Sequence, residues 1–152
     1  MSQEPSSETM QRQRWLAVLA RAATDQLEAC WAAADRPACT LLRQPEIGLV
    51  MARGRAGGSG QRFNLGEITV TRCVVQSADG HIGHGYVAGR DRRKAELVAR
   101  FDALLQAPGR RAALLAQVVE PLAAAQAEAR AAQARKAAAT RVEFFTLVRG
   151  DG

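Results

Sequence analysis

The first third of the chain carries apolar residues at helical spacing. The stripe consists of Trp15, Leu16, Leu19 and Ala23. Its spacing predicts a helix over about residues 9–22. Asp25 and Glu28 then form a capping-box pattern for a second, short helix that ends at about Ala34. Two such consecutive segments are typical of a helical hairpin.

After Pro37 the periodicity changes to short apolar runs that favour strands. These runs cover residues 39–44, 47–53, 67–76 and 81–89. Pro45 and Glu46 separate the first two runs, and a tight-turn sequence, Ala-Asp-Gly, precedes the last. Four strands in hairpin order predict an antiparallel sheet.

Helical periodicity returns at Asp91, which can cap a helix that ends before Pro108 and Gly109. The apolar face of this helix consists of Leu97, Val98, Phe101, Leu104 and Leu105. A further apolar stripe consists of Leu114, Leu115, Val118 and Val119. Pro121 is placed to begin another helix in its first turn. Eleven of the eighteen residues from 122 to 139 are alanine, which favours a helix with little side chain to bury.

The last segment has a different pattern, because residues 141–148 read RVEFFTLV and place large apolar groups at odd and even positions alike. Successive side chains of a strand point to opposite faces, so this pattern predicts a strand that is apolar on both faces. Both faces of such a strand must be buried by other elements or by another protein. It either enters the middle of the fold or buries its second face against another protein.

Together these elements predict an α+β fold with one domain over residues 9–152 and a disordered tail over residues 1–8. The fold comprises an N-terminal helical hairpin, an antiparallel β-sheet of four or five strands covered by two or three helices, and a C-terminal strand that joins the sheet or a partner. A length of 152 residues with 47% hydrophobic residues fits a single domain with a substantial core.

The chain is basic, with a formal net charge of +6 and a sequence pI of about 10.2. This favours an anionic partner such as nucleic acid, a nucleotide, a phosphate ester or an acidic protein face. Lys94 and Lys136 are the only lysines, and the planar fork of arginine suits phosphate and carboxylate. A coding bias that also enriches alanine explains the arginine excess equally well.

Cysteine spacing and hydropathy indicate the compartment. Cys30, Cys39 and Cys73 are widely spaced, which favours buried free thiols over a disulfide framework or a zinc site. No apolar run approaches the ~20 residues needed to span a bilayer, and no secretory signal is evident. We therefore expect a cytoplasmic protein without a membrane partner.

Residues 53–63, RGRAGGSGQRF, combine three arginines with four glycines. They lack the lysine and hydroxyl of a Walker loop, and the strand predicted after them is incompatible with a dinucleotide-binding fingerprint. Two interpretations stay open: a flexible hairpin turn, or a loop whose backbone NH groups and arginines bind an anion. The candidate residues for the second are Arg53, Arg55, Gly57, Gly58, Gly60 and Arg62.

Arg90 is a further candidate, because it lies where a strand ends and a helix begins. Asp91, however, can fill that helix N-terminus itself as the cap. His81 and His84 do not predict a metal site, since residues three apart on a strand point to opposite faces and no further ligand is suitably placed. No nucleophile, base and acid combine into an independent active site.

Four blocks of the sequence, taken in order, resemble a known family. They are RQRWLAVLARA, IGLVMARGRAGGSGQRFNLGEITVTRCVV, DGHIGHGYVAGRDRRKAELVARFDALL and RVEFFTLVRGDG. Between about Arg12 and Asp151 the chain is similar to the PhnG family, the G subunit of the bacterial phosphonate carbon-phosphorus lyase system.

The resemblance implies a non-redox, mainly architectural subunit of a transferase complex. In that complex a phosphonate displaces adenine from MgATP at the ribose anomeric carbon. The implied partner subunits are PhnH, PhnI, PhnJ and PhnL, and this chain is expected to bind no cofactor, since MgATP and alkylphosphonate are substrates of the complex. No catalytic residue carries over. An assembly role would make the last strand an interface, with Phe144, Phe145, Leu147 and Arg149 as its residues.

Two other functions remain as alternatives to this one. The first is a small basic nucleic-acid-binding protein, which rests on the charge alone, because 5% aromatic residues provide few stacking surfaces. The second is a free-standing nucleotide hydrolase, which would have to turn over ATP without other subunits.

Overall fold

The computed structural model of the chain describes residues 4–55, 57 and 60–148, with side chains up to residue 141. Its elements in chain order are α1 (Ser7–Arg21), α2 (Thr24–Ala33), β1 (Cys39–Arg55), β2 (Arg62–Ser77), β3 (Ile82–Ala88), α3 (Arg92–Gln106), α4 (Pro108–Leu114), the π-helical turn η2 (Leu115–Val119) and α5 (Glu120–Val148). The α+β class is confirmed.

The two N-terminal helices are present, but their pairing as a hairpin is not confirmed. Helix α1 begins two residues earlier than expected, because the Ser6 hydroxyl accepts the Thr9 N–H at 3.2 Å and caps it. Helix α2 has Ala23 at its N-cap, whose N–H donates to the Gln26 side chain. The predicted capping box of Asp25 and Glu28 is therefore wrong. Both helices pack against α3.

Within residues 4–55, 57 and 60–148 the sheet has three antiparallel strands in the order β1-β2-β3, not four or five. The runs at 39–44 and 47–53 are one strand, because irregularities in the pairing with β2 absorb the intervening residues. Pro45 lies within this strand, where its missing N–H is tolerated since β1 is an edge strand.

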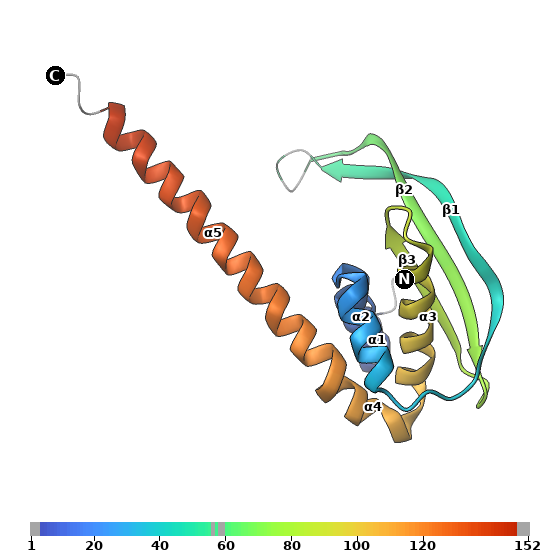
Figure 1. The fold of residues 1–152 in the computed structure, drawn as a ribbon. Coiled ribbons are helices and arrows are strands. Elements are labelled where there is room, and N and C mark those ends of the chain that lie inside the picture. Colours follow the sequence, from blue (N-terminus) through green and yellow to red (C-terminus); the bar gives the residue numbers. More distant parts are fainter. Residues whose placement is uncertain (1–3, 56, 58–59, 149–152) are drawn as a thin grey trace.

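Helix α3 covers one face of the sheet at unusually close range (Figure 1). Its predicted cap is confirmed, since the Asp91 carboxylate accepts the Lys94 N–H at 2.9 Å. A Cβ atom at Gly83 or Gly85 would lie 1.9 Å from a carbonyl oxygen of α3, that of Ala99 or Ala95 respectively. These two glycines of β3 therefore let the helix backbone approach the strand.

The predicted apolar face of α3 forms the centre of the core. Its members Leu97, Val98, Phe101, Leu104 and Leu105 are all 0% exposed. Trp31 of α2 meets the Phe101 ring edge-on with a centroid separation of 5.3 Å. The core thus lies between the sheet on one side and α1 and α2 on the other (Figure 1).

After α3 the chain passes from α4 through η2 into α5 as a nearly continuous helical segment. Pro121 stands in the first turn of α5, as predicted. In a regular α-helix its ring would collide with the carbonyl of residue 117. The wider π turn relieves this collision, because the Glu120 N–H reaches back to the Leu115 carbonyl.

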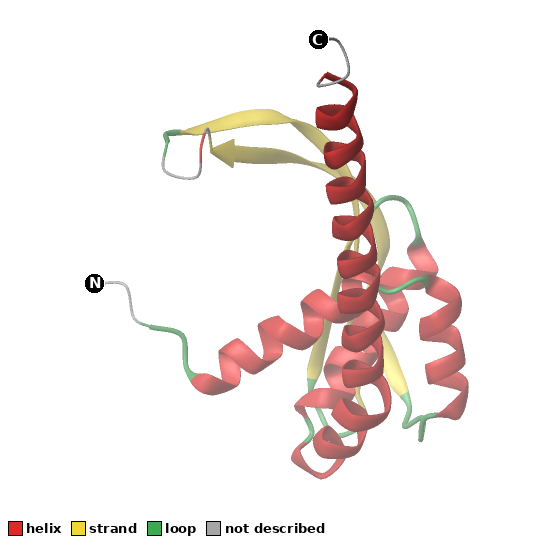
Figure 2. Ribbon diagram, turned by 90° about the vertical axis from the view of Figure 1, so that its left-hand side faces the viewer, coloured by secondary structure: helices red, strands yellow, loops and turns green. Residues whose placement is uncertain are grey.

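The expected C-terminal strand at 141–148 is wrong, since these residues continue α5. No glycine or proline interrupts the chain between the alanine-rich stretch and Val148, so the helix propagates through it. Phe144, Phe145 and Leu147 lie in α5, and their side chains are outside the described part of the chain, as is all of Arg149. Helix α5 projects away from the core (Figures 1 and 2).

A second projection comes from the sheet. Strand β3 pairs with β2 only from Val70 to Gln76, so the far ends of β1 and β2 extend beyond it as a two-stranded ribbon (Figure 1). We call this ribbon, residues 49–55 and 62–69, the arm. Its end lies at the pair Arg55 and Arg62, next to the glycine-rich connection.

Candidate functional site

The register of the arm places three arginines on one face. Directly paired residues of an antiparallel ladder share a face, as do residues two apart on one strand. Arg55 is paired with Arg62, and Arg53 precedes Arg55 by two residues. All three side chains are exposed. We call this group, Arg53, Arg55 and Arg62, the arginine tip.

The same face of β1 is apolar between the core and the tip. Ile47, Leu49 and Met51 are 39%, 64% and 48% exposed, and they alternate in phase with Arg53. Ile47 is paired with Thr71, which is buried on the side of the sheet that α3 covers. An exposed apolar stripe therefore continues the covered side of the sheet outward to the arginine tip.

The opposite face of the arm is apolar as well. Ile68 is paired with Val50 and Phe63 with Gly54, and both large side chains are 46% exposed. Leu65 is the extra residue at an irregularity in β2, lies against Gly54 and is 65% exposed. A ribbon that exposes apolar groups on both faces is typical of a segment covered by another protein.

The arginine tip surrounds a shallow hollow of about 230 Å³, lined by Arg53, Gly54, Arg55 and Arg62. None of the ion pairs that the described residues form includes a tip arginine. Gly57 has a left-handed φ of +63°, Gly60 lies in a bend and Gly58 falls outside the described residues. Convergence of their NH groups on an anion stays a prediction.

Arg90 is exposed but lies apart from the arginine tip. The adjacent Gly89 N–H donates to the Thr69 carbonyl at the base of the arm, and seven residue-to-residue steps of ~3.3 Å separate Thr69 from Arg62. The helix N-terminus beside Arg90 is filled by Asp91. Donation from the Thr24 hydroxyl, followed by the Lys94 N–H, holds the pKa of Asp91 below its usual value. This end of α3 is therefore already capped by a carboxylate.

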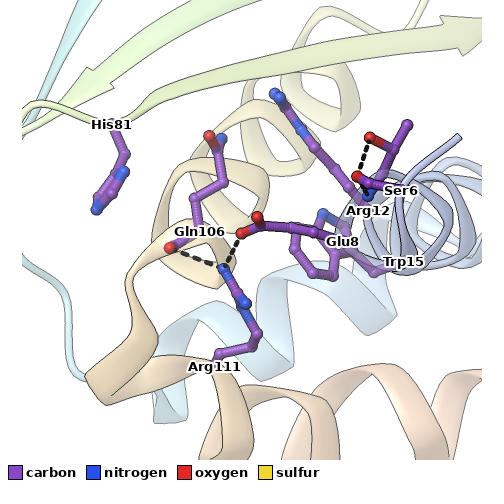
Figure 3. A pocket seen from close by; sticks show the side chains of 8 residues that line it. Ser6, Glu8, Arg12, Trp15, His81, Gln106 and Arg111 are labelled. Atoms are coloured by element: carbon purple, nitrogen blue, oxygen red, sulfur yellow. Dashed lines mark hydrogen bonds and ion pairs between the residues drawn. The ribbon is translucent and has the colours of Figure 1, made fainter.

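The structure contains a second cationic region, a cavity of about 340 Å³ between α1, the β2–β3 turn and the end of α3 (Figure 3). Its lining residues are Ser6, Glu8, Thr9, Arg12, Trp15, His81, Gln106 and Arg111. Beneath it lies Asp102, which is 0% exposed.

Asp102 organises the floor of this cavity. Its carboxylate accepts hydrogen bonds from Arg12 Nη2 at 2.8 Å, Arg12 Nε at 3.2 Å, Trp15 Nε1 at 2.8 Å and the His84 backbone N–H at 2.9 Å. These donors join α1, α3 and β3 through one buried charge. A buried carboxylate with this many donors is a structural anchor.

Arg111 is engaged as well. It donates to the last carbonyls of α3, those of Leu105 and Gln106, at 2.8 and 3.0 Å. It also lies 5.6 Å from the centroid of the Trp15 ring and 3.3 Å from Glu8 (Figure 3). Arg12 and Arg111, the two arginines that line the cavity, thus make contacts that stabilise the fold.

The two histidines do not come together as metal ligands. His81 lines the cavity, whereas His84 contributes its backbone N–H to Asp102. Within the described ranges, no cluster of three or more His, Cys, Asp or Glu could hold a metal ion.

Sequence reasoning missed the Asp102 network. The signal was present, because a lone aspartate lies next to Phe101 within the apolar face predicted for α3. A charged residue in such a position indicates either a buried pair or a functional group. Its partner Arg12 had no distinguishing pattern of its own.

Comparison with known proteins identifies the family of this chain. Residues 10–150 match the family model of the phosphonate metabolism protein PhnG, and the chain belongs to this family. One relative is the alpha-D-ribose 1-methylphosphonate 5-triphosphate synthase subunit PhnG of Rhizobium meliloti (strain 1021). It is 46% identical over 142 residues, which cover 93% of this chain and 90% of the relative. Among the described helices, none has the length and apolar character to cross a bilayer.

Proposed function

We propose that this chain is the G subunit of an α-D-ribose 1-methylphosphonate 5-triphosphate synthase complex. The complex transfers the ribose 5-triphosphate moiety of MgATP to methylphosphonate and releases adenine. The observation that carries this proposal is the near full-length similarity to a relative with that name, at 46% identity. The chain is thereby a subunit of a transferase and is not expected to catalyse the reaction alone.

The role of this subunit is mainly architectural. The charged groups around the 340 Å³ cavity are engaged in holding α1, α3 and β3 together. The arm, by contrast, exposes Leu49, Met51, Phe63, Leu65 and Ile68. Apolar exposure on both faces of a projecting ribbon supports docking of the arm on a neighbouring subunit.

The proposed partners are PhnH, PhnI, PhnJ and PhnL, in the cytoplasm. MgATP and alkylphosphonate are substrates of the whole complex, and this chain holds no cofactor of its own. The residues proposed for ligand or partner binding are Arg53, Arg55, Gly57, Gly58, Gly60, Arg62 and Arg90. The C-terminal end of α5 and the residue after it, with Phe144, Phe145, Leu147 and Arg149, are a second proposed interface.

Copurification with the candidate partners tests this proposal. The tagged chain is coexpressed with PhnH, PhnI, PhnJ and PhnL, and adenine release from MgATP plus methylphosphonate is measured with and without it. We expect the chain to copurify with at least one partner and adenine release to fall when it is omitted. Failure to copurify, together with undiminished release in its absence, would contradict the proposal.

The same preparation separates the alternatives. The isolated chain is expected to release neither adenine nor phosphate from ATP. Its binding to random DNA is expected to be lost at physiological ionic strength, since charge alone would support it. Tight DNA binding under those conditions would favour the nucleic-acid-binding alternative instead.

A further inference from the structure

We propose that the arginine tip binds the triphosphate group of the nucleotide substrate while that nucleotide sits in the active site of a neighbouring subunit. This inference rests on the proposed function, and it assigns the tip a ligand of stated chemistry, a nucleoside triphosphate. The arm is then more than a docking element, because it delivers three guanidinium groups to a site that this chain does not contain.

The first argument is the charge arrangement at the tip. Arg55 and Arg62 are directly paired across the ladder, and like charges in that position repel one another. Arg53 adds a third positive charge on the same face. The only acidic residue of the arm is Glu67, which is paired with Met51 and forms none of the ion pairs among the described residues. A bound anion would convert this repulsion into attraction.

The second argument is the contrast with the other arginines of the chain. Nine of them pair with a carboxylate within the described residues: Arg12, Arg14, Arg43, Arg72, Arg93, Arg100, Arg110, Arg111 and Arg135. The tip arginines have no such partner among the described residues. Other described arginines lack one as well, namely Arg21, Arg36, Arg90, Arg92, Arg130 and Arg141. The tip differs from these in that Arg55 and Arg62 are directly paired across the ladder, with Arg53 on the same face. Their arrangement is thus explained by a counter-charge from outside the chain.

The third argument is reach. Seven residue-to-residue steps of ~3.3 Å, from Thr69 to Arg62, place the tip about 23 Å beyond the base of the arm. That is well over the ~8 Å screening length at physiological salt, so acidic groups near the core do not neutralise it. The exposed apolar groups along both faces can seat the arm on the neighbour, which brings the tip to a fixed place.

The fourth argument is chemical fit. Guanidinium groups bind phosphate oxygens through two parallel hydrogen bonds, and a triphosphate offers several such edges. The hollow of about 230 Å³ between Arg53, Arg55 and Arg62 is several times the ~30 Å³ of one water molecule and accommodates a phosphate group. Arginines supplied by a second protein stabilise phosphate charge in other nucleotide enzymes. An acidic protein surface is the competing occupant, and assembly measurements distinguish it.

The test uses the reconstituted complex with Arg55→Gln, Arg62→Gln and the double variant. We expect normal assembly in size-exclusion chromatography. The KM for MgATP should rise at least about tenfold, which is the effect of losing one charge-assisted hydrogen bond. Titration with a fluorescent nonhydrolysable ATP analogue is expected to show the same weakening without turnover. Arg55→Lys, which keeps the charge but not the fork, should recover part of the affinity. Arg130→Gln, an exposed arginine of α5, is the matched control and should change neither quantity.

The melting temperature of the isolated chain distinguishes binding from a structural role, because removing a structural arginine would lower it. Because the tip charges repel, Arg55→Gln is expected to leave the melting temperature unchanged or raise it. Loss of assembly in the tip variants would overturn the proposal in favour of contact with an acidic protein surface. Unchanged KM and analogue affinity with intact assembly would also overturn it. Failure of the wild-type chain to assemble would instead count against the proposed function.

Discussion

Arg12 and Arg55 are the same residue type in opposite settings. Arg12 makes two hydrogen bonds to Asp102, a carboxylate that is 0% exposed, and links α1 to α3. Arg55 lies at the end of the arm opposite Arg62, with no carboxylate partner among the described residues. The first setting stabilises this fold and the second does not. The presence of an arginine alone does not indicate its role. An arginine whose charge is balanced by a buried carboxylate of the same chain stabilises the fold, whereas one without such a partner is available for binding.

The same contrast holds for apolar side chains. In the core, Leu97 and Phe101 are fully buried against elements of this chain. On the arm, Leu49 and Leu65 are 64% and 65% exposed. Burial of such side chains contributes ~25 cal/mol per Å² of apolar surface, and the arm leaves that contribution unused in the isolated chain. Substitutions in the two regions should therefore separate stability from assembly.

The largest expected effect comes from removing the buried anchor. Asp102→Ala leaves Arg12, Trp15 Nε1 and the His84 N–H without their shared acceptor, and breaking a buried charged network costs about 3–5 kcal/mol. Urea denaturation of the purified chain measures this loss. Asp35→Ala, at an exposed aspartate, is the control and should stay within about 0.5 kcal/mol of wild type. A comparable loss in both variants would show that Asp102 is not an anchor.

The next effect comes from the contact between β3 and α3. Gly85→Ala places a Cβ 1.9 Å from the Ala95 carbonyl oxygen, so the helix must move away from the sheet. Overpacking of this kind costs about 1–3 kcal/mol or more, again by urea denaturation. Gly48→Ala, where nothing lies within 4 Å of the added carbon, is the matched strand control. Equal stability of the two variants would contradict the close approach seen here.

Helix α3 and the strands beside it also show which features of the fold can be predicted from the sequence. Helix α3 and its cap were predictable, because a strong apolar period and Asp91 indicate the same element. The role of Gly83 and Gly85 was not predictable, since it depends on contacts with Ala99 and Ala95, which lie ten or more residues further along the chain. Pro45 suggested a break between strands, but a local pattern does not distinguish a turn from an irregularity in an edge strand.

The candidate site was predictable in part. The arginines and glycines of residues 53–63 stood out by composition, but their common face follows only from the register of β1 and β2. The sequence predicts a strand that is apolar on both faces, and therefore needs a partner, at residues 141–148, but these residues are helical. The need for a partner applies instead to the arm, whose two apolar faces are shared between strands that are distant in sequence. Eight residues without a clear period do not separate strand from helix.

A smaller effect on stability, with a clear effect on binding, is expected on the arm. Leu65→Ser removes an apolar side chain that is 65% exposed, so the free energy of unfolding should stay within about 0.5 kcal/mol of wild type. Affinity for the partner subunit should fall about tenfold, equivalent to ~1.4 kcal/mol, in a binding titration with the purified partner. Met10→Ser, an exposed methionine of α1, is the control. Unchanged affinity would exclude this face of the arm from the interface.

The smallest effect tests whether pairing or burial decides what an arginine contributes. Arg14 and Glu120 form an ion pair at 2.7 Å, but their side chains are 50% and 55% exposed. Donation from Arg14 holds the pKa of Glu120 below its usual value. Any contribution of the pair is therefore present at neutral pH and is lost as the pH falls through the lowered pKa. Because solvent screens such a pair, Arg14→Gln should leave the urea midpoint at pH 7 within experimental error. A loss as large as that of Asp102→Ala would mean that a carboxylate partner alone, irrespective of burial, makes an arginine structural.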